Sequence, residues 1–297
     1  MSERIPRVSV VIPVYNRGKY IAETIGSVLG QTVKDVEIIA VDDGSKDESR
    51  SVLDSFGSAI QVIEHPNRGN RGQSASINLG MRAARGEFIA VLDSDDVWAP
   101  EKLARQLAYF DAHPDVGLVY GNGWVIDGEG KRLYPFYQPD HREDSDVNRV
   151  LLDCYFLLPS NSLVRTAVFR KAGWFDESFR AAQDHDMAIR IAEITRLAYL
   201  NEFIFYYRRH EDSISVKNAD RRWKNGFLIL DRAAARHAYP ASVVRRRRAV
   251  LHFRLGQCEA KSRHFASALR HFVLAGLLDP FRTLSVLTGR ETVTSPN

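Results

Sequence analysis

Short apolar strands alternate with amphipathic helices over the first 113 residues, and this alternation constrains the fold more than any other feature. Strands are predicted at residues 8–12, 36–41, 60–64 and 88–92, and helices at 18–30, 45–53, 74–84 and 101–113. Strands that are apolar along their whole length are buried on both faces, as in a parallel sheet covered by helices. The sequence therefore predicts an α/β fold with a mostly parallel central sheet.

The rest of the chain has a weaker pattern that ends in helices. A hairpin is predicted at residues 116–127 and 131–137, and short helices at 166–172 and 187–193. Residues 138–165 show no clear period. From Trp223 onward the pattern is helical, with apolar residues such as Leu255, Leu269, Val273 and Leu277 spaced as a helix pair. Residues 290–297 are predicted to be disordered.

The charge of the chain is unevenly distributed. Its net charge of +4 comes from 41 Lys and Arg against 37 Asp and Glu, but residues 206–297 hold 18 basic and only 7 acidic residues. This asymmetry points to an anionic partner at the C-terminal end. Nucleic acid is disfavoured, because aromatic residues are not interleaved with the basic ones. Arg245–Arg248 lie on a predicted helix, as a solvated basic face or as a contact with an anionic membrane.

The cysteines and the lack of a long apolar segment indicate a cytoplasmic protein. Cys154 and Cys258 are far apart and lack metal-binding spacing, so neither a disulfide framework nor a structural zinc site is predicted. No stretch approaches the ~20 apolar residues of a membrane span. Any membrane contact is therefore expected to be peripheral, on the inner face.

Acidic clusters follow two of the predicted strands directly. Asp42 and Asp43 come after the second strand, and Asp93, Asp95 and Asp96 come after the fourth. Such residues are common in turns, but ligands bind at this edge of an open α/β sheet. Crowded carboxylates repel one another unless a cation lies among them, and Mg2+ or Mn2+ suits a carboxylate site that also binds a diphosphate.

Several segments together resemble the family 2 glycosyltransferases, which have the nucleotide-sugar-binding GT-A fold. The segments are VSVVIPVYN at 8–16, IGSVLGQT at 25–32, VDDGS at 41–45, residues 67–78, GEFIAVLDSDD at 86–96, GWFDE at 173–177 and QDHDMAIR at 183–190. The resemblance covers about the first 215 residues. It implies a nucleotide-sugar-binding half at residues 1–115, an acceptor-binding half at 116–215 and a helical basic appendage at 216–297.

The resemblance implies inverting transfer of a sugar from a nucleotide-diphosphate donor to a hydroxyl of a glycan or lipid-linked acceptor, in the synthesis of a bacterial surface polysaccharide. Pro13 and Tyr15 match the segment that holds the base, and Asp43 matches the carboxylate that accepts the base imide proton. Uracil, thymine and guanine present such a proton, whereas N3 of cytosine is an acceptor. A UDP-sugar donor is therefore expected first, with dTDP- and GDP-sugars as alternatives.

The resemblance also implies residues that hold the diphosphate and the metal. Asn78, and less firmly Arg71, match the helix beside the diphosphate. Asp93 matches the first acid of the DxD motif, near the ribose or the metal, and Asp95 matches its last acid, a direct ligand of Mn2+ or Mg2+. His210, which lies in a loop, matches a histidine that reaches the diphosphate or the metal.

Asp184 matches the catalytic base of the family. The family usually has Glu-Asp here, and Gln183 departs from that pattern by replacing a charged neighbour with a neutral amide. Asp184 could instead cap the helix at 187–193, but Asp186 is the better N-cap by position. One base suffices, because a nucleotide diphosphate leaves as an anion that a metal neutralises, without the protonation that a glycosidase must supply.

Two other classes of protein share parts of this pattern. A sugar nucleotidyltransferase or a dinucleotide oxidoreductase should have a Gly-rich phosphate loop after the first strand, and Pro13-Val14-Tyr15-Asn16 is not one. A catalytically inactive, glycan- or partner-binding relative stays open as an alternative. Such a relative would have no reason to keep Asp43, Asp93, Asp95 and Asp184 together.

Overall fold

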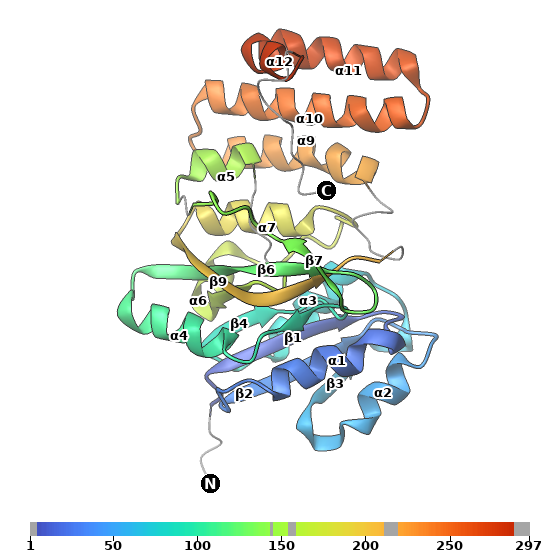
Figure 1. Cartoon of the computed structure of the whole chain (residues 1–297), viewed down its shortest axis with the longest axis vertical. Helices are drawn as coiled ribbons and strands as arrows, with labels where there is room; N and C mark the ends of the chain where they lie inside the picture. Colours follow the sequence, from blue (N-terminus) through green and yellow to red (C-terminus); the bar gives the residue numbers. More distant parts are fainter. Residues whose placement is uncertain (1–4, 143–144, 154–158, 211–218, 288–297) are drawn as a thin grey trace. The chain divides into compact units, whose positions relative to one another are not determined.

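Two compact units make up the chain in the computed structural model shown in Figure 1. The structure describes residues 5–142, 145–153, 159–210 and 219–287. The first unit comprises Met1–Ser145 and Phe156–His210, and the second comprises Asp146–Tyr155 and Glu211–Asn297. The predicted boundaries at residues 115 and 215 are functional divisions and stay predictions.

One mixed sheet forms the centre of the first unit (Figure 1). Its strands in the described residues are β1 (Val8–Val14), β2 (Val36–Asp42), β3 (Gln61–Glu64), β4 (Phe88–Val91), β5 (Val97–Trp98), β6 (Val116–Ile126), β7 (Arg132–Pro135), β8 (Ser162–Arg165) and β9 (Arg196–Arg208). Their order is β3-β2-β1-β4-β8-β6-β9-β5, with β7 paired to β6. Most paired residues lie in parallel ladders, because β1 pairs in parallel with β2 and β4, β2 with β3, and β6 with β9. The predicted α/β fold is confirmed.

Helices flank this sheet and make up the second unit. In the first unit they are α1 (Gly18–Leu29), α2 (Ser49–Ser55), α3 (Gln73–Ala83), α4 (Lys102–Ala112), α6 (Thr166–Ala172) and α7 (Gln183–Ala192), with short 3-10 turns at Gly57–Ala59 and Pro66–Arg68. In the second unit they are α5 (Val147–Asp153), α9 (Ala219–Arg236), α10 (Ala241–Lys261), α11 (Phe265–Leu278) and α12 (Pro280–Leu287).

The core of the first unit is formed by β1, the strands beside it and the helices that pack on them. Every residue of β1 is buried, including Ser9, as expected for a strand that is apolar at its other positions. On α1, Ile21, Ile25 and Val28 recur every three or four residues and pack into the same core. Full burial of each such side chain contributes about 1.5–3 kcal/mol, so the edge of β1 is a rigid base for the loops that follow it.

Helices also pack together in the second unit. Both α9 and α11 contact α10, which confirms the predicted helix pair (Figure 1). Arg247 on α10 is buried and donates a hydrogen bond to the carbonyl of Leu152 on α5. Within the described residues, no helix is long and apolar enough to cross a membrane. The predicted disorder at residues 290–297 lies outside the described part.

Two predicted helix starts are wrong. The helix predicted from Ser45 begins at Ser49, and the Ser45 hydroxyl instead accepts a hydrogen bond from the backbone of Asn16. The helix predicted from 187 begins at Gln183, after Ala182 in a left-handed conformation with φ of 65°. Asp186 therefore lies inside the first turn of α7 and is not an N-cap.

Gly80 on α3 tests how closely the helices pack on the sheet. A Cβ atom there would lie 2.4 Å from Val11 Cγ1 and 3.1 Å from Val41 Cγ2. We expect Gly80→Ala to destabilise the protein by about 1–3 kcal/mol, measured by urea unfolding, because the two valines must shift. Gly26→Ala is the matched control, because its Cβ would meet nothing within 4 Å. It should stabilise α1 by about 0.5–1 kcal/mol, and equal effects would contradict the close packing.

Candidate active site

Three neighbouring parallel strands end at the same edge of the sheet and carry the predicted acidic clusters. β1 lies between β2 and β4, and Val14 at the end of β1 is in register with Asp42 at the end of β2. Asp43 follows β2 directly, and the loop from Asp93 to Asp96 follows β4. The two clusters therefore lie beside one another on the ligand-binding edge of the sheet.

Asp43 holds the loop that precedes α3. Its buried carboxylate accepts hydrogen bonds from the backbone N–H groups of Arg71 at 2.6 Å and Gly72 at 2.8 Å. His65 Nε2 lies 3.6 Å from the same carboxylate. Arg71, which the sequence predicts as a phosphate contact, thus contacts Asp43 through its backbone N–H. Two accepted bonds leave further lone pairs on Asp43 for a ligand.

Pro13 and Tyr15 lie in different environments at the end of β1. Pro13 is buried within the strand and in register with Val41. Tyr15 follows the strand and is 40% exposed. Of the two residues, Tyr15 therefore has the accessible ring that stacking on a base requires, while Pro13 shapes the strand beneath it.

Asp95 is held by two nitrogen donors. Its Oδ2 atom accepts from Arg17 Nε at 3.0 Å and lies 2.9 Å from His210 Nε2. Burial raises the pKa of Asp95, but the hydrogen bond from His210 and the charge of Arg17 outweigh it and lower the pKa below its usual value. The structure therefore brings together Asp95 and His210, which the sequence placed 115 residues apart.

Asp96 anchors the loop to the far end of β9. Its buried carboxylate accepts from the hydroxyl of Ser160 and from the backbone N–H of Arg208 at 2.8 Å. Arg208 Nε donates to the carbonyl of Asp95 at 2.8 Å, and its guanidinium also pairs with Glu23. Burial, with the charges of Asp95 and Asp93, raises the pKa of Asp96 well above its usual value. Arg208 fixes the strand end from which His210 reaches Asp95.

Asp93 is the end of a chain of side-chain amides. Gln183 Nε2 donates to Gln73 Oε1 at 2.7 Å, and Gln73 Nε2 donates to Asp93 Oδ1 at 2.7 Å. Burial, with the charges of Asp95 and Asp184, raises the pKa of Asp93 to about 7. The chain connects the DxD loop with the first turns of α3 and α7.

Asp184 lies in the first turn of α7, partly buried, one residue after Gln183. Its charge acts on Asp93, so the predicted base lies near the DxD carboxylates. Asp186, two residues further along α7, is buried and pairs with Arg190 at 2.7 Å instead of capping the helix. Of the two acids, Asp184 is therefore the one whose charge acts on the carboxylate cluster.

Asn78 supports the loop before α7. Its buried amide donates to the carbonyl of Phe175 and to Glu177 Oε1, both at 2.9 Å, and accepts from Phe175 N–H at 2.9 Å. Both amide protons are therefore engaged within the protein. This geometry favours a positioning role for Asn78 over the direct diphosphate contact that the sequence predicts.

Four residues of this site were missed by the sequence analysis: Arg17, Gln73, Ser160 and Arg208. Arg17 directly follows the segment at 8–16, which was its only signal. Ser160 and Arg208 lie 64 and 113 residues from the acids that they contact, and no local pattern announces such contacts.

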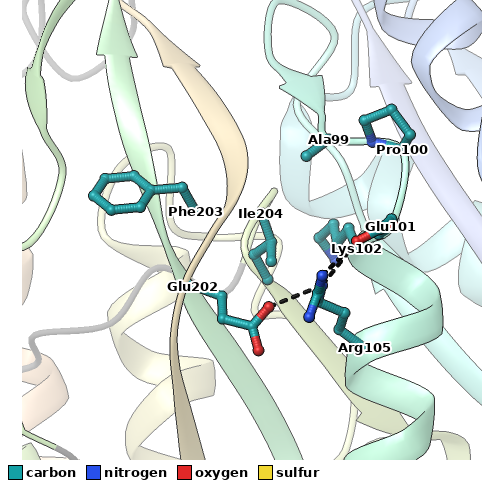
Figure 2. Close-up of a pocket in the computed structure, with 8 residues that line it drawn as sticks. All are labelled: Ala99, Pro100, Glu101, Lys102, Arg105, Glu202, Phe203 and Ile204. Atoms are coloured by element: carbon teal, nitrogen blue, oxygen red, sulfur yellow. Dashed lines mark hydrogen bonds and ion pairs between the residues drawn. The ribbon is translucent and has the colours of Figure 1, made fainter.

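A surface hollow lies outside this acidic cluster. Figure 2 shows its lining, in which Arg105 pairs with Glu101 and Glu202. The hollow measures about 350 Å³ and is lined by Ala99, Pro100, Glu101, Lys102, Arg105, Glu202, Phe203 and Ile204. The Lys102 side chain is buried, with its ammonium 4.0 Å from the centre of the Trp98 ring. Neither Asp43 nor any of the acids from Asp93 to Asp96 lines this hollow.

The donor atoms at Asp95 and His210 suit a divalent cation. In the part of the chain that the structure describes, no group of three or more His, Cys, Asp or Glu side chains converges on one point. Asp95 and His210 would thus supply two ligands, one oxygen and one nitrogen, and a bound diphosphate would have to supply others. Such a mixed set is compatible with Mn2+ and, less well, with Mg2+.

Relatives in sequence support this assignment. Residues 9–173, which are more than half of the chain, match the family model described as Glycosyl transferase family 2. An uncharacterised glycosyltransferase of Rickettsia typhi is 31% identical over 217 residues. The match covers 69% of this chain and 65% of that protein, so the chain spans slightly less than two thirds of its relative.

Solved structures show the same fold. TarS of S. aureus, residues 1–349 in complex with UDP-GlcNAc, superposes with a TM-score of 0.69 at 20% identity, over 91% of this chain and 81% of that one. The mannosyltransferase PcManGT of Pyrobaculum calidifontis, in complex with GDP-Man and Mn2+, superposes with a TM-score of 0.63 at 18% identity, over 97% and 80% of the two chains. With the strand-end acids in place and the family model matched, the chain belongs to glycosyltransferase family 2 and has the GT-A fold.

Proposed function

We propose that this glycosyltransferase inverts the anomeric centre of a sugar that it takes from a nucleotide-diphosphate donor. The observation that carries the proposal is the convergence of Asp43, Asp93 and Asp95 at adjacent strand ends, with Asp184 close enough to Asp93 to raise its pKa. A base and a diphosphate-binding edge are the two parts that such a reaction needs.

The donor is a UDP-sugar in this proposal, with dTDP- and GDP-sugars as alternatives. The exposed ring of Tyr15 offers a stacking surface, and the Asp43 carboxylate keeps lone pairs for an imide N–H. Cytosine lacks that proton, which disfavours CMP-sugars as donors. Solved relatives in fold bind UDP-GlcNAc and GDP-Man, which is consistent with this range.

Asp95 and His210 hold Mn2+ or Mg2+ in this proposal. The metal, when bound, would neutralise the charge that develops on the leaving diphosphate. In the structure Arg17 pairs with Asp95, and His210 Nε2 lies 2.9 Å from the same carboxylate. Because Arg17 contacts the same Oδ2 atom as His210, it also keeps the side chain of Asp95 oriented toward the site.

Asp184 acts as the general base. It takes the proton of the acceptor hydroxyl while that oxygen attacks the anomeric carbon from the face opposite the diphosphate. The first turn of α7 positions this carboxylate, and the hydrogen bonds from Gln183 through Gln73 to Asp93 hold that turn against the DxD loop. A second protein acid is not needed, since the leaving group departs as an anion.

The acceptor is a glycan or a lipid-linked sugar in the synthesis of a cell-surface polysaccharide, and the basic C-terminal unit contacts an anionic membrane from the cytoplasmic side. The structure narrows the basic cluster that the sequence indicates for this contact. Arg245 and Arg246 are exposed. Arg247 is buried and donates a hydrogen bond to a carbonyl of α5, and Arg248 pairs with Asp231. Only the first two have the accessible charge that a lipid headgroup requires.

Asp184→Asn tests the base. We expect transfer to fall by roughly 100-fold to 10,000-fold, while nucleotide affinity and melting temperature stay near wild type, because an amide cannot take the proton. The measurement is release of UDP from UDP-sugars with an acceptor and Mn2+. Asp176→Asn is the control, because that carboxylate accepts hydrogen bonds from the backbone N–H and the hydroxyl of Ser178 in its own loop. Normal turnover by the Asp184 variant would remove the assignment, and no turnover of any donor by wild type would favour the inactive relative.

Asp95→Asn tests the metal site. At about 100 times its Kd, UDP with Mn2+ should stabilise wild type by about 2.7 kcal/mol in a thermal-shift assay. The variant should lose the Mn2+-dependent part of this stabilisation, because it loses the charged oxygen ligand. CDP is the comparison nucleotide and should stabilise wild type less than UDP. An unchanged response to Mn2+ in the variant would disprove Asp95 as a ligand.

Asp93→Asn tests the crowding of charge. The folded-state pKa of about 7 lies above the ordinary value of 3.8, so wild type loses stability as pH rises between these values. In metal-free buffer the variant should therefore melt above wild type at pH 7 and higher, with a difference that shrinks toward pH 4. A difference that stays constant from pH 4 to pH 8 would show that Asp93 titrates normally.

A further inference from the structure

Large apolar side chains of α11 point into solvent. Phe265, Leu269, Val273 and Leu277 recur every four residues and are 69%, 65%, 52% and 75% exposed. Phe281 at the start of α12 is 86% exposed. The sequence predicts Leu269, Val273 and Leu277 as part of a packed helix pair, and the structure corrects this.

Other side chains of α11 make its contact with α10: Phe272 packs against Phe253, and His271 lies beside His252. Ala268 and Ala275 are the buried residues of α11. The helices are also close at Gly256 of α10, where an added Cβ would lie 2.8 Å from the ring of Phe272. The exposed side chains of Phe265, Leu269, Val273 and Leu277 are therefore not needed for the contact between α10 and α11. They are exposed because their spacing in the helix places them on another face.

An exposed apolar face of this length requires an occupant. Soluble proteins rarely expose apolar patches above a few hundred Å², and larger ones mark interaction sites. At 100° per residue the four side chains span about 120° of the α11 surface, and Arg270 lies at the edge of this arc. A continuous apolar arc with an adjoining cation is the pattern of a helix that lies in a membrane interface.

Charge decides between the occupants. Residues 219–287 contain 14 Lys and Arg against 4 Asp and Glu. Two copies of such a unit repel each other, whereas an anionic lipid surface attracts it. Arg263 and Arg270, both exposed, lie directly before α11 and within it. Their long side chains can keep their charges at the headgroups while the apolar face enters the interface.

We propose that the outward face of α11, formed by Phe265, Leu269, Val273 and Leu277, inserts into the interface of an anionic membrane. This inference rests on the proposed membrane contact of the second unit and names the surface that makes it. It adds an apolar component to that contact, so that Arg245 and Arg246 attract the protein and α11 retains it.

Vesicle flotation tests the proposal with the full chain. Wild type should float with vesicles of phosphatidylcholine and phosphatidylglycerol, and much less with phosphatidylcholine alone. Leu269→Ser with Val273→Ser should lower the partition coefficient for the anionic vesicles more than tenfold. Leu228→Ser is the matched control, because Leu228 is 45% exposed on α9 and lies outside the apolar face. Leu277→Ser alone provides a second test if the double variant misfolds.

Salt separates the two components of binding. Arg245→Gln with Arg246→Gln should weaken capture at low salt, whereas binding by α11 should leave a fraction of wild type on the vesicles at high salt. The proposal would be overturned if the Leu269→Ser, Val273→Ser variant bound the anionic vesicles as well as wild type. Complete release of wild type from the vesicles by salt would also overturn it. So would a wild-type dimer in solution that dissociates in the double variant, because the face would then bind a second copy.

Enzyme activity is measured separately on a soluble acceptor without vesicles. The double-serine variant should keep the wild-type rate of UDP release there, because α11 does not contribute to the strand-end site. Loss of vesicle binding with retained turnover supports the proposal. Vesicle binding by a wild type that turns over no donor would leave the membrane surface intact and reject the proposed function alone.

Discussion

Crowding of carboxylates at one sheet edge is the constraint on which the rest of the site depends. Asp93, Asp95 and Asp96 lie within four residues, and Asp184 adds a fourth carboxyl group. Two like charges 4 Å apart cost about 4 kcal/mol at the effective dielectric near a protein surface. Each acid is therefore held differently: Asp95 by two nitrogen donors, Asp96 by an N–H and a hydroxyl, and Asp93 by an amide. Because these acids are buried, a positive charge added at the site would interact strongly with them.

β9 supplies part of this compensation from a distant part of the chain. It pairs in parallel with β6 along its length and antiparallel with β5 near its end, so its register is fixed on both sides. That register places Arg208 under the loop at Asp95 and Asp96, and His210 follows two residues later. The DxD loop and β9 thus stabilise each other, and neither position can be explained from its local sequence.

The parts that the sequence predicts are those with a local physical signature. The first four strands are mostly apolar, and their alternation with helices implies the parallel edge to which Asp43 and Asp93 belong. β9 is missed because exposed residues such as Arg196 and Phe203 interrupt its apolar pattern. The start of α7 is misplaced because the helix follows a left-handed Ala182, and alanine gives no capping signal. Arg17 and Gln73 are missed because their contacts are long-range and polar.

The two glutamines form a network that ends at Asp93. When Asp93 is ionised its carboxylate only accepts hydrogen bonds, and Gln73 turns its NH2 group toward Asp93 and its oxygen toward Gln183. Gln183 must then turn its own NH2 group toward Gln73, which leaves its buried oxygen without a hydrogen-bond partner in the part of the chain that the structure describes. An unsatisfied buried acceptor costs about 1–3 kcal/mol. That cost falls beside Asp184, in the first turn of α7. A glutamate at 183 would remove the donor to Gln73 and add another carboxyl group to the edge, so the neutral amide is the residue that keeps this network intact.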